Sequence, residues 1–262
     1  MRSSPSDPPP TCRRSRCGLG VELHGHGALR RLDCGDVAIN LFVGSALEGG
    51  PANVHLRLQS GTVWDSSPLL GPRGPTAWRR DAGDGALVGR GRWRGLAYDI
   101  ALRLADGATV WFWHVRLRNE NAATAVVDLI HAQDLALAPW AAVRLNEYYV
   151  SQYIDHAPLQ HAEHGIVVAS RQNQAASGRH PWCLIGSLRR GVSFATDALQ
   201  LHGLAGRAGA PLPGLARGLP GERLQHEHSM VAIQDAPLRL EPGQSAALGF
   251  FGWFVADHAA AT

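Results

Sequence analysis

Apolar and polar residues alternate along most of this chain in short segments that are separated by turn residues. Such a period-two pattern is typical of β-strands with one face in a core and the other toward water. The pattern shows no convincing amphipathic helix, and the best candidate, residues 195–204, is short and ends in glycine. A succession of strands without helices favours an all-β fold, an antiparallel sandwich, over βαβ units. The expected strands cover Val37–Val43, Val54–Leu58, Trp93–Leu104, Thr109–Asn119, Ala125–Leu137, Arg144–Asp155, Gly165–Arg171, Trp182–Leu188, Val192–Thr196, Ser229–Gln234 and Ala246–Val255.

One β-hairpin can be predicted in more detail. Trp93–Leu104 and Thr109–Asn119 flank the pair Asp106-Gly107, which favours a two-residue type I′ turn. In the second strand the apolar residues share one face, and His114 and two arginines share the other. We expect the tryptophan-bearing face to lie in the core between two sheets; its residues are Trp111, Trp113, Val115 and Leu117.

The length of 262 residues suits one large domain with a sizeable core. The start of the chain is rich in proline and serine, so we expect a disordered leader at residues 1–17 and a β-sandwich domain at residues 18–262. Two stretches rich in glycine and proline, Ser66–Arg80 and Leu204–Glu222, are expected to be loops that form no strands.

Charge and composition exclude several classes of function. All 25 basic residues are arginine, and the formal net charge is only +3. They form no basic stripe interleaved with aromatic residues, so nucleic acid is not an expected partner. The leader lacks the apolar region of a secretory signal, and the longest apolar run, around Ala246–Val255, is about half as long as a membrane span. We therefore expect a cytoplasmic protein with no membrane contact. Four unevenly spaced cysteines predict neither a disulfide framework nor a zinc site.

The segment from Asn146 to Asn173 is unusually polar and aromatic for an expected strand and its following loop. Pure packing would favour valine, isoleucine and leucine, because each buried polar atom needs a partner. Aromatic faces beside arginine and amide groups suit sugars, so this segment suggests the rim of a site for a polar ligand. The candidate binding residues are Tyr149, Tyr153, Arg171, Gln172, Asn173 and Trp182. Alternatively, the tyrosines are β-formers on a half-exposed sheet, and Arg171 fastens the loop by pairing with Asp155 or Glu163.

Catalytic and metal sites receive less support from the sequence. A pair of carboxylates for glycoside hydrolysis could come from Asp128, Asp134, Glu147 and Asp155, although acidic residues on strand edges are usually solvated. Histidines that could bind a metal are His156, His161, His164, His226 and His228, but no firm third ligand is spaced with the last pair. We therefore assign no catalytic residue and no metal ligand.

Several longer motifs carry a resemblance to a known family. INLFVGSALEGGPANVHLR (39–57), NEYYVSQYIDHAPLQHAEHG (146–165), SRQNQ (170–174), HPWCLIGS (180–187) and GFFGWFVADH (249–258) resemble the N-terminal domain of glycoside hydrolase family ninety-four. The 1,2-β-oligoglucan phosphorylases are the most similar members, with cellobiose phosphorylase and cyclic β-1,2-glucan synthase as relatives. The resemblance runs from about Gly25 to His258.

The resemblance implies a super-β-sandwich similar to galactose mutarotase. In the family this domain precedes an (α/α)6-barrel that holds the catalytic acid and the phosphate site, and it supports the barrel, dimer formation and the sugar cleft. The expected function is thus a non-catalytic, carbohydrate-associated domain with no cofactor, inorganic phosphate being bound outside this chain. Expected partners are a β-linked gluco-oligosaccharide, the barrel domain and a second copy in a homodimer. The alternative is a self-sufficient aldose mutarotase, which would use a histidine and a carboxylate as acid and base.

Overall fold

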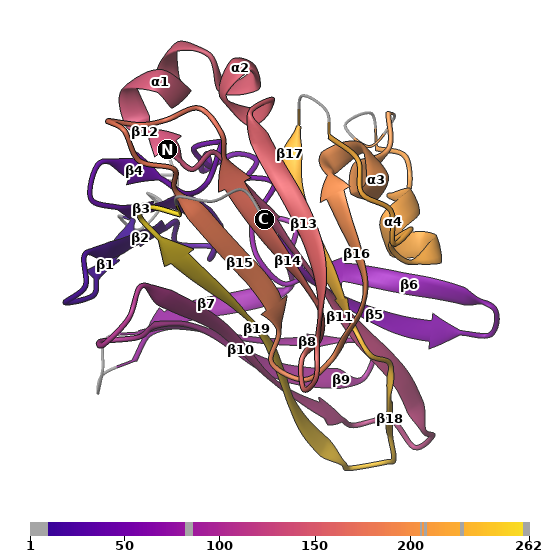
Figure 1. Ribbon diagram of the computed structural model, residues 1–262. Helices are drawn as coiled ribbons and strands as arrows, with labels where there is room; N and C mark the ends of the chain where they lie inside the picture. Colours follow the sequence, from indigo (N-terminus) through magenta and orange to yellow (C-terminus); the bar gives the residue numbers. More distant parts are fainter. Residues whose placement is uncertain (1–9, 82–85, 205, 207–208, 226–227, 259–262) are drawn as a thin grey trace.

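The computed structural model describes residues 10–81, 86–204, 206, 209–225 and 228–258 (Figure 1). The described chain consists mainly of antiparallel strands in two sheets, and the expected all-β super-β-sandwich is thereby confirmed. A five-stranded sheet contains β1 (Thr11–Arg14), β2 (Leu19–Leu23), β3 (Leu29–Cys34), β4 (Val37–Ala38) and β12 (Ala138–Pro139).

A second, 14-stranded sheet makes up most of the molecule. Its main path follows the order β6-β5-β11-β17-β16-β14-β15-β19-β10-β9-β8-β7, with β13 paired to β14 and β18 paired to β11. The strand next to the C-terminus, β19, therefore lies inside this sheet, between β15 and β10. The strands of this sheet are β5 (Asn53–Ser60), β6 (Val63–Pro68), β7 (Thr76–Arg80), β8 (Leu87–Trp93), β9 (Leu96–Leu104), β10 (Val110–Asn119), β11 (Ala125–Asp134), β13 (Ile154–His161), β14 (Gly165–Gln172), β15 (Trp182–Ser187), β16 (Gly191–Asp197), β17 (Ser229–Asp235), β18 (Leu238–Leu240) and β19 (Ser245–Val255).

The main core forms where the two ends of the large sheet pack face to face. Trp111 and Trp113 of β10 share one buried cluster with Leu56 of β5 and Leu129 of β11. The prediction that the tryptophan-bearing face of β10 lies in the core is confirmed, because all four apolar residues of that face are buried. The turn was predicted wrongly: Ala105 N donates to Val110 O, so residues 106–109 form a longer connection. Neither Asp106 nor Gly107 has the positive φ that a type I′ turn requires.

Four short helices contribute to the described fold: α1 (Trp140–Leu145), α2 (Glu147–Ser151), α3 (Ala198–His202) and α4 (Pro213–Arg217). Helices α3 and α4 contact β16, β17 and β6 and cover part of the outer face of the large sheet (Figure 1). Leu201 and Leu215 of these helices pack with Ile130 of β11 in a second buried cluster. The helix candidate at residues 195–204 is confirmed in part, since Asp197 caps α3 through a capping box.

The prediction of a strand at Arg144–Asp155 was wrong for most of its length. Two helices, α1 and α2, occupy this segment, and only its last two residues belong to β13. The Asn146 side chain accepts a hydrogen bond from Tyr149 N and thereby caps α2, which satisfies a backbone donor that a strand would have paired differently. The alternation of polar and aromatic residues was misleading because a one-turn helix gives no period long enough to recognise.

Two further expectations need correction, one about a loop and one about the start of the chain. Strand β6 extends to Pro68, and Thr76–Arg80 forms β7, which pairs with β8, so Ser66–Arg80 is not wholly a loop. Pro68 lies at the end of β6, on the outer edge of the sheet, where a missing N–H breaks no ladder. Regular structure also begins before Gly18, because Thr11–Arg14 pairs with Leu23–Gly20 of β2. Residues 1–9 of the expected leader lie outside the described residues.

A buried ion pair fastens β5 to its neighbour β11. Arg57 Nε donates to Asp128 Oδ1 at 2.7 Å and Nη2 donates to Oδ2 at 2.5 Å, and both side chains are almost inaccessible to solvent. Arg57 Nη1 donates to the Leu215 carbonyl of α4 at 2.9 Å, and Gln234 Nε2 donates to Asp128 Oδ2 at 2.9 Å. The guanidinium also lies 4.5 Å from the ring centroid of Trp64 in β6. This network joins four strands and one helix.

We predict that Asp128→Asn lowers the free energy of unfolding by about 3–5 kcal/mol, because it leaves the buried Arg57 guanidinium without its counter-ion. Urea denaturation followed by tryptophan fluorescence measures the change. The control is Glu120→Gln, which breaks the exposed Arg92–Glu120 pair and should change stability by only about 0–1 kcal/mol. Equal effects of the two substitutions would contradict the importance of the buried pair.

Candidate functional site

Most of the residues predicted from the sequence to bind a ligand meet at one end of strands β14, β15 and β19. Arg171 in β14 pairs in register with Trp182 in β15, and Trp182 pairs with Val255 in β19. The segment after β19 folds back over this end, because His258 N donates to the His180 carbonyl at 2.8 Å. Ladder pairing and this chain reversal together bring Arg171 and His258, which lie 87 positions apart, into hydrogen-bond contact.

Two tyrosines extend this group from the side of α2. Tyr149 and Tyr153 lie one helical turn apart, with ring centroids separated by 5.0 Å in an edge-on arrangement. The Tyr153 hydroxyl donates a hydrogen bond to the Tyr149 hydroxyl at 2.9 Å, and this bond raises the pKa of Tyr153. Asn173 N donates to the Tyr153 carbonyl at 2.8 Å, which links the tyrosines to the end of β14.

Trp182, which is half-buried, is the centre of a cluster of rings near the surface. Its ring lies edge-on to Trp253 of β19, with centroids 5.5 Å apart, and it stacks against His258 at 5.7 Å. Trp253 is 43% exposed, an unusual degree for so large an apolar side chain. Arg171 Nε donates to the His258 carbonyl at 2.9 Å, and Arg171 Nη1 donates to Asn173 Oδ1.

These contacts define a continuous group that we call the aromatic surface: Tyr149, Tyr153, Arg171, Asn173, Trp182, Trp253 and His258. It combines exposed ring faces with hydrogen-bond donors and acceptors, which is the chemistry that a sugar with apolar ring faces and hydroxyl edges requires. Among the described residues, Arg171 Nη2 has no hydrogen-bond partner and remains available to a ligand.

The structure places Gln172 apart from the other five predicted residues. Its side chain is fully buried, and its Nε2 donates to the carbonyls of Ala136 and Val150 at 3.0 and 3.1 Å. Its Oε1 accepts from Gln174 N at 3.0 Å. Gln172 therefore holds the loop before α1, the helix α2 and the end of β14 together, and its amide lies in the interior because strand alternation turns it away from Arg171.

The alternative in which Arg171 pairs with Asp155 or Glu163 is not what the structure shows. Asp155 lies beside Arg171 in the register of β13 and β14, yet it forms an ion pair with Arg223. Sequence reasoning also missed Trp253 and His258. The alternation of β19 could have identified Trp253, because Leu248, Phe250 and Phe254 point inward and Trp253 has the opposite parity. No sequence pattern indicates that the segment after β19 folds back.

The four carboxylates considered for catalysis do not form one pair. Asp128 is occupied by Arg57, Glu147 lies half-buried at the start of α2, and Asp155 pairs with Arg223. Asp134 is buried, and burial raises its pKa to about 6, while hydrogen bonds from the backbone N–H groups of Phe42 and Leu41 favour the charged form. Both of these groups donate to Oδ2, and Gln133 Nε2 donates to Oδ1 at 3.3 Å, so both carboxylate oxygens are engaged within the protein.

The histidines considered as metal ligands are also dispersed. His156 is buried and hydrogen-bonds through its two ring nitrogens to the Ser170 and Ser229 hydroxyls, at 2.9 and 3.1 Å. Burial lowers its pKa to about 3. His161 and His164 stack on each other near the β13–β14 turn, and His228 lies against Tyr148. His226 lies outside the described residues. No group of three or more potential metal ligands occurs within the described part of the chain.

Comparison with known proteins assigns the chain to a family. The model of the SOGP N-terminal domain matches residues 22–252. The chain belongs to this family. The SOGP N-terminal domain described here is 29% identical, over 222 residues, to a 1,2-beta-oligoglucan phosphorylase from Listeria innocua. The match covers 84% of this chain and 19% of the Listeria protein, so the chain spans about a fifth of that relative. The resemblance found in the sequence motifs is confirmed.

Two solved structures share the fold of this SOGP N-terminal domain. A polysaccharide lyase overlays on 97% of the chain, over 33% of its own length, with a TM-score of 0.53 and 11% identity. A bacterial glucoamylase complexed with acarbose covers 93% of the chain and 31% of its own length, with a TM-score of 0.50 and 6% identity. At such low identity these likenesses concern the fold alone. In the described residues no helix has the length and apolar character needed to span a membrane.

The buried histidines of this SOGP N-terminal domain predict a loss of stability in acid. Burial lowers the pKa of His156 to about 3, of His55 to about 3 and of His131 to about 4, whereas an unfolded histidine has a pKa near 6.5. As the pH falls below about 6.5, these histidines become protonated in the unfolded chain but stay neutral in the folded chain. The free energy of unfolding therefore falls until the pH reaches the pKa values of the folded state. Asp134 has the opposite effect on the free energy of unfolding between about pH 4 and 6, because its pKa is raised in the folded state and the folded chain takes up this proton first as the pH falls.

We therefore predict that His156→Gln weakens the pH dependence of the free energy of unfolding. Between pH 7 and pH 5 the wild type should lose up to about 2 kcal/mol more unfolding free energy than the variant, since one such histidine contributes up to about 1.4 kcal/mol per pH unit. Urea titrations at the two pH values measure this difference. His161→Gln removes an exposed imidazole and serves as the matched control, which should follow the wild type. If the free energy of unfolding of His156→Gln depends on pH as that of the wild type does, His156 is not a cause of the acid sensitivity.

Proposed function

We propose that this chain is a carbohydrate-associated sandwich domain of a glycoside phosphorylase that acts on β-linked gluco-oligosaccharides, and that its aromatic surface contacts the sugar. The observation that carries the proposal is the aromatic surface itself, found on a chain that belongs to the SOGP N-terminal domain family. Tyr149 and Trp253 leave 46% and 43% of their surfaces exposed, which is unusual for large rings that serve only to pack.

In this proposal the chain binds and positions, and the chemistry takes place on another domain. The relative from Listeria innocua is named a 1,2-beta-oligoglucan phosphorylase and is about five times as long as the matched region, which leaves room for a catalytic domain such as an (α/α)6-barrel. The catalytic acid and the site of the phosphate that is consumed would lie there, and the sandwich would need no cofactor. A homodimer and a cytoplasmic location complete the proposal.

The geometry of the aromatic surface suggests how a sugar is held. Trp182 and Trp253 meet edge-on, so one ring can stack on the apolar face of a pyranose while the edge of the other limits its position. Arg171 Nη2 and the exposed Asn173 amide lie on the same surface and can bond to hydroxyl groups. The Tyr149–Tyr153 pair provides a second, separate contact region for an oligosaccharide of several units.

We predict that Trp182→Ala and Tyr149→Ala each weaken binding of β-1,2-linked gluco-oligosaccharides about 3- to 10-fold, because one stacked ring contributes about 0.5–1.5 kcal/mol. Isothermal titration calorimetry measures the dissociation constants. Tyr148 is the matched control for Tyr149: it lies on the same helix with 39% exposure against 46%, but its ring packs on Phe42 and His228. Tyr148→Ala should leave affinity unchanged. Equal affinities of all variants would remove the aromatic surface as a sugar site.

We further predict that the 262-residue chain alone releases no glucose 1-phosphate from β-1,2-glucan and inorganic phosphate. The reason is that the proposal places the acid and the phosphate ligands on another domain. A coupled phosphoglucomutase assay, compared with heat-inactivated protein, measures release. Polarimetry of freshly dissolved α-glucose tests the alternative in parallel: accelerated mutarotation would identify a self-sufficient epimerase instead.

A further inference from the structure

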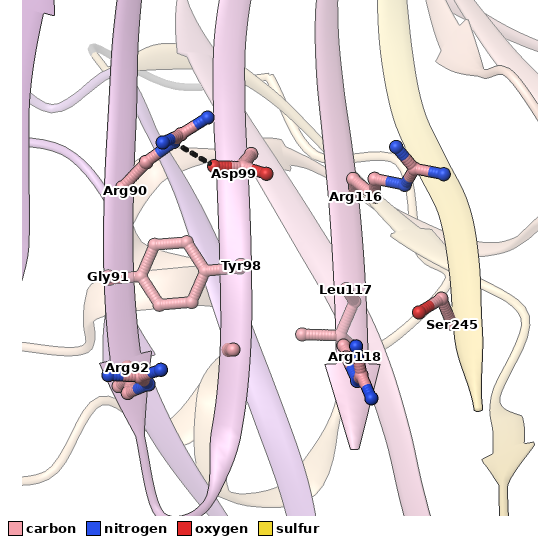
Figure 2. A pocket seen from close by; sticks show the side chains of 10 residues that line it. Arg90, Gly91, Arg92, Tyr98, Asp99, Arg116, Leu117, Arg118 and Ser245 are labelled. Atoms are coloured by element: carbon pink, nitrogen blue, oxygen red, sulfur yellow. Dashed lines mark ion pairs between the residues drawn. The ribbon is translucent and has the colours of Figure 1, made fainter. Parts of the chain in front are cut away.

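A second surface, separate from the aromatic surface, lies on the outer face of strands β8, β9, β10 and β19. It contains a hollow of about 610 Å³ whose lining includes Arg90, Arg92, Arg116 and Arg118 (Figure 2). We call it the arginine hollow. Its chemistry differs from that of the aromatic surface, because charged guanidinium groups dominate it and Asp99 is the one carboxylate in its lining. Neither the family assignment nor the aromatic surface accounts for it.

Sheet register explains why the arginines converge. Across the strands, Arg92 faces Ala97, Ala97 faces Arg118, and Arg118 faces Ser245. Strands β8 and β10 lie about 10 Å apart because β9 runs between them. Arg92 and Arg118 therefore stand on either side of the short methyl group of Ala97. The small side chain of Ala97 leaves the space between the two arginines open, and Ser245 lies beyond Arg118 on the neighbouring strand (Figure 2).

The next row of the sheet is only partly neutralised. Arg90 faces Asp99, which faces Arg116, and Arg90 Nε lies 2.7 Å from Asp99 Oδ1. On the first row, Arg92 Nε pairs with Glu120 Oε2 at 3.0 Å. Four arginines therefore stand against two carboxylates, an excess of two positive charges. Within the described residues, the side chains of Arg116 and Arg118 form no hydrogen bond and no ion pair.

This arrangement is unfavourable for folding alone. Arg116 and Arg118 are two positions apart on one strand face, about 7 Å, and like charges at that spacing repel each other. The two existing ion pairs are exposed and contribute little to stability. An anion seated between the guanidinium groups would relieve the repulsion, and planar arginine groups can bind phosphate oxygens in a bidentate manner.

We propose that the arginine hollow binds a phosphate group, carried either by inorganic phosphate or by a sugar phosphate. Charge decides the class of ligand, since the excess of two positive charges matches a phosphate dianion. Volume decides its size, since about 610 Å³ lies in the range of small-molecule sites and leaves room for a sugar ring beside the phosphate.

The test is isothermal titration calorimetry of the full chain with inorganic phosphate, with glucose 1-phosphate and with neutral glucose, all at one ionic strength. The double variant Arg116→Gln/Arg118→Gln removes the two unpaired charges while keeping side-chain length similar, and it should weaken binding of both phosphates at least tenfold. Arg217→Gln, which removes an exposed arginine of α4 far from the hollow in the chain, is the matched control and should bind like the wild type. Circular dichroism and a thermal melt confirm that each variant is folded.

Each outcome of this test either supports the phosphate-binding proposal or overturns it. Saturable binding of both phosphates, lost in the double variant alone, supports the proposal, and the tighter of the two identifies the source of the phosphate. No saturable binding of either phosphate by the wild type overturns it and leaves the arginines as solubilising surface groups. Binding that persists in the double variant also overturns it. The proposal is also overturned if the wild type binds no phosphate but associates with itself or with a polyglutamate probe, and the double variant loses this association. The hollow would then be a protein-docking surface. Because neutral oligoglucan is not a ligand here, failure of this test leaves the function of the aromatic surface unaffected.

Discussion

The fold depends on a charged pair placed where charge is costly. Arg57 and Asp128 face each other across β5 and β11, in a region from which water is excluded, and their remaining polar atoms are satisfied by Gln234 and the Leu215 carbonyl. A buried pair of this kind is not in itself a strong source of stability. Its value lies in specificity: only one register of β5 against β11 and one position of α4 satisfy every donor. The outer edge of the large sheet and the helices that cover it are therefore fixed together.

Gln172 has a similar role at the other end of the molecule. Its amide bonds to backbone groups of three segments that are distant in the chain, the loop before α1, helix α2 and the segment after β14. The neighbouring Arg171 and Asn173 point outward because alternate strand residues occupy opposite faces. One side chain in the interior thus positions two on the surface. This explains how a sequence triplet that looks uniformly polar divides into one buried structural residue and two residues at the surface.

Much of the architecture could be predicted from alternation alone, because an antiparallel sandwich repeats a simple pattern over many residues. Trp111 and Trp113 were placed correctly in the core for that reason. The failures occurred where structure depends on a single contact. The Asn146 cap converts an expected strand into α2, and the loop at residues 106–109 is longer than the expected two-residue turn and lacks its positive φ values. For the site, sequence proximity identified Tyr149, Tyr153, Arg171, Asn173 and Trp182, whereas Trp253 and His258 join them only through ladder pairing and chain reversal.

The interior position of β19 has a consequence for how the chain acquires its structure. Its partner β10 is made more than a hundred residues earlier, and the two strands pair along nearly their whole length. Until β19 is available, both β10 and β15 present unpaired backbone edges, which are templates for pairing with other chains. Long-range pairing of this kind slows folding. In a chain emerging from the ribosome, the free edge of β10 would be present from about residue 119 and that of β15 only from about residue 187, until β19 is made and inserts between them. A nascent chain of this domain would therefore be most prone to pair with other chains in the interval just before β19 is complete.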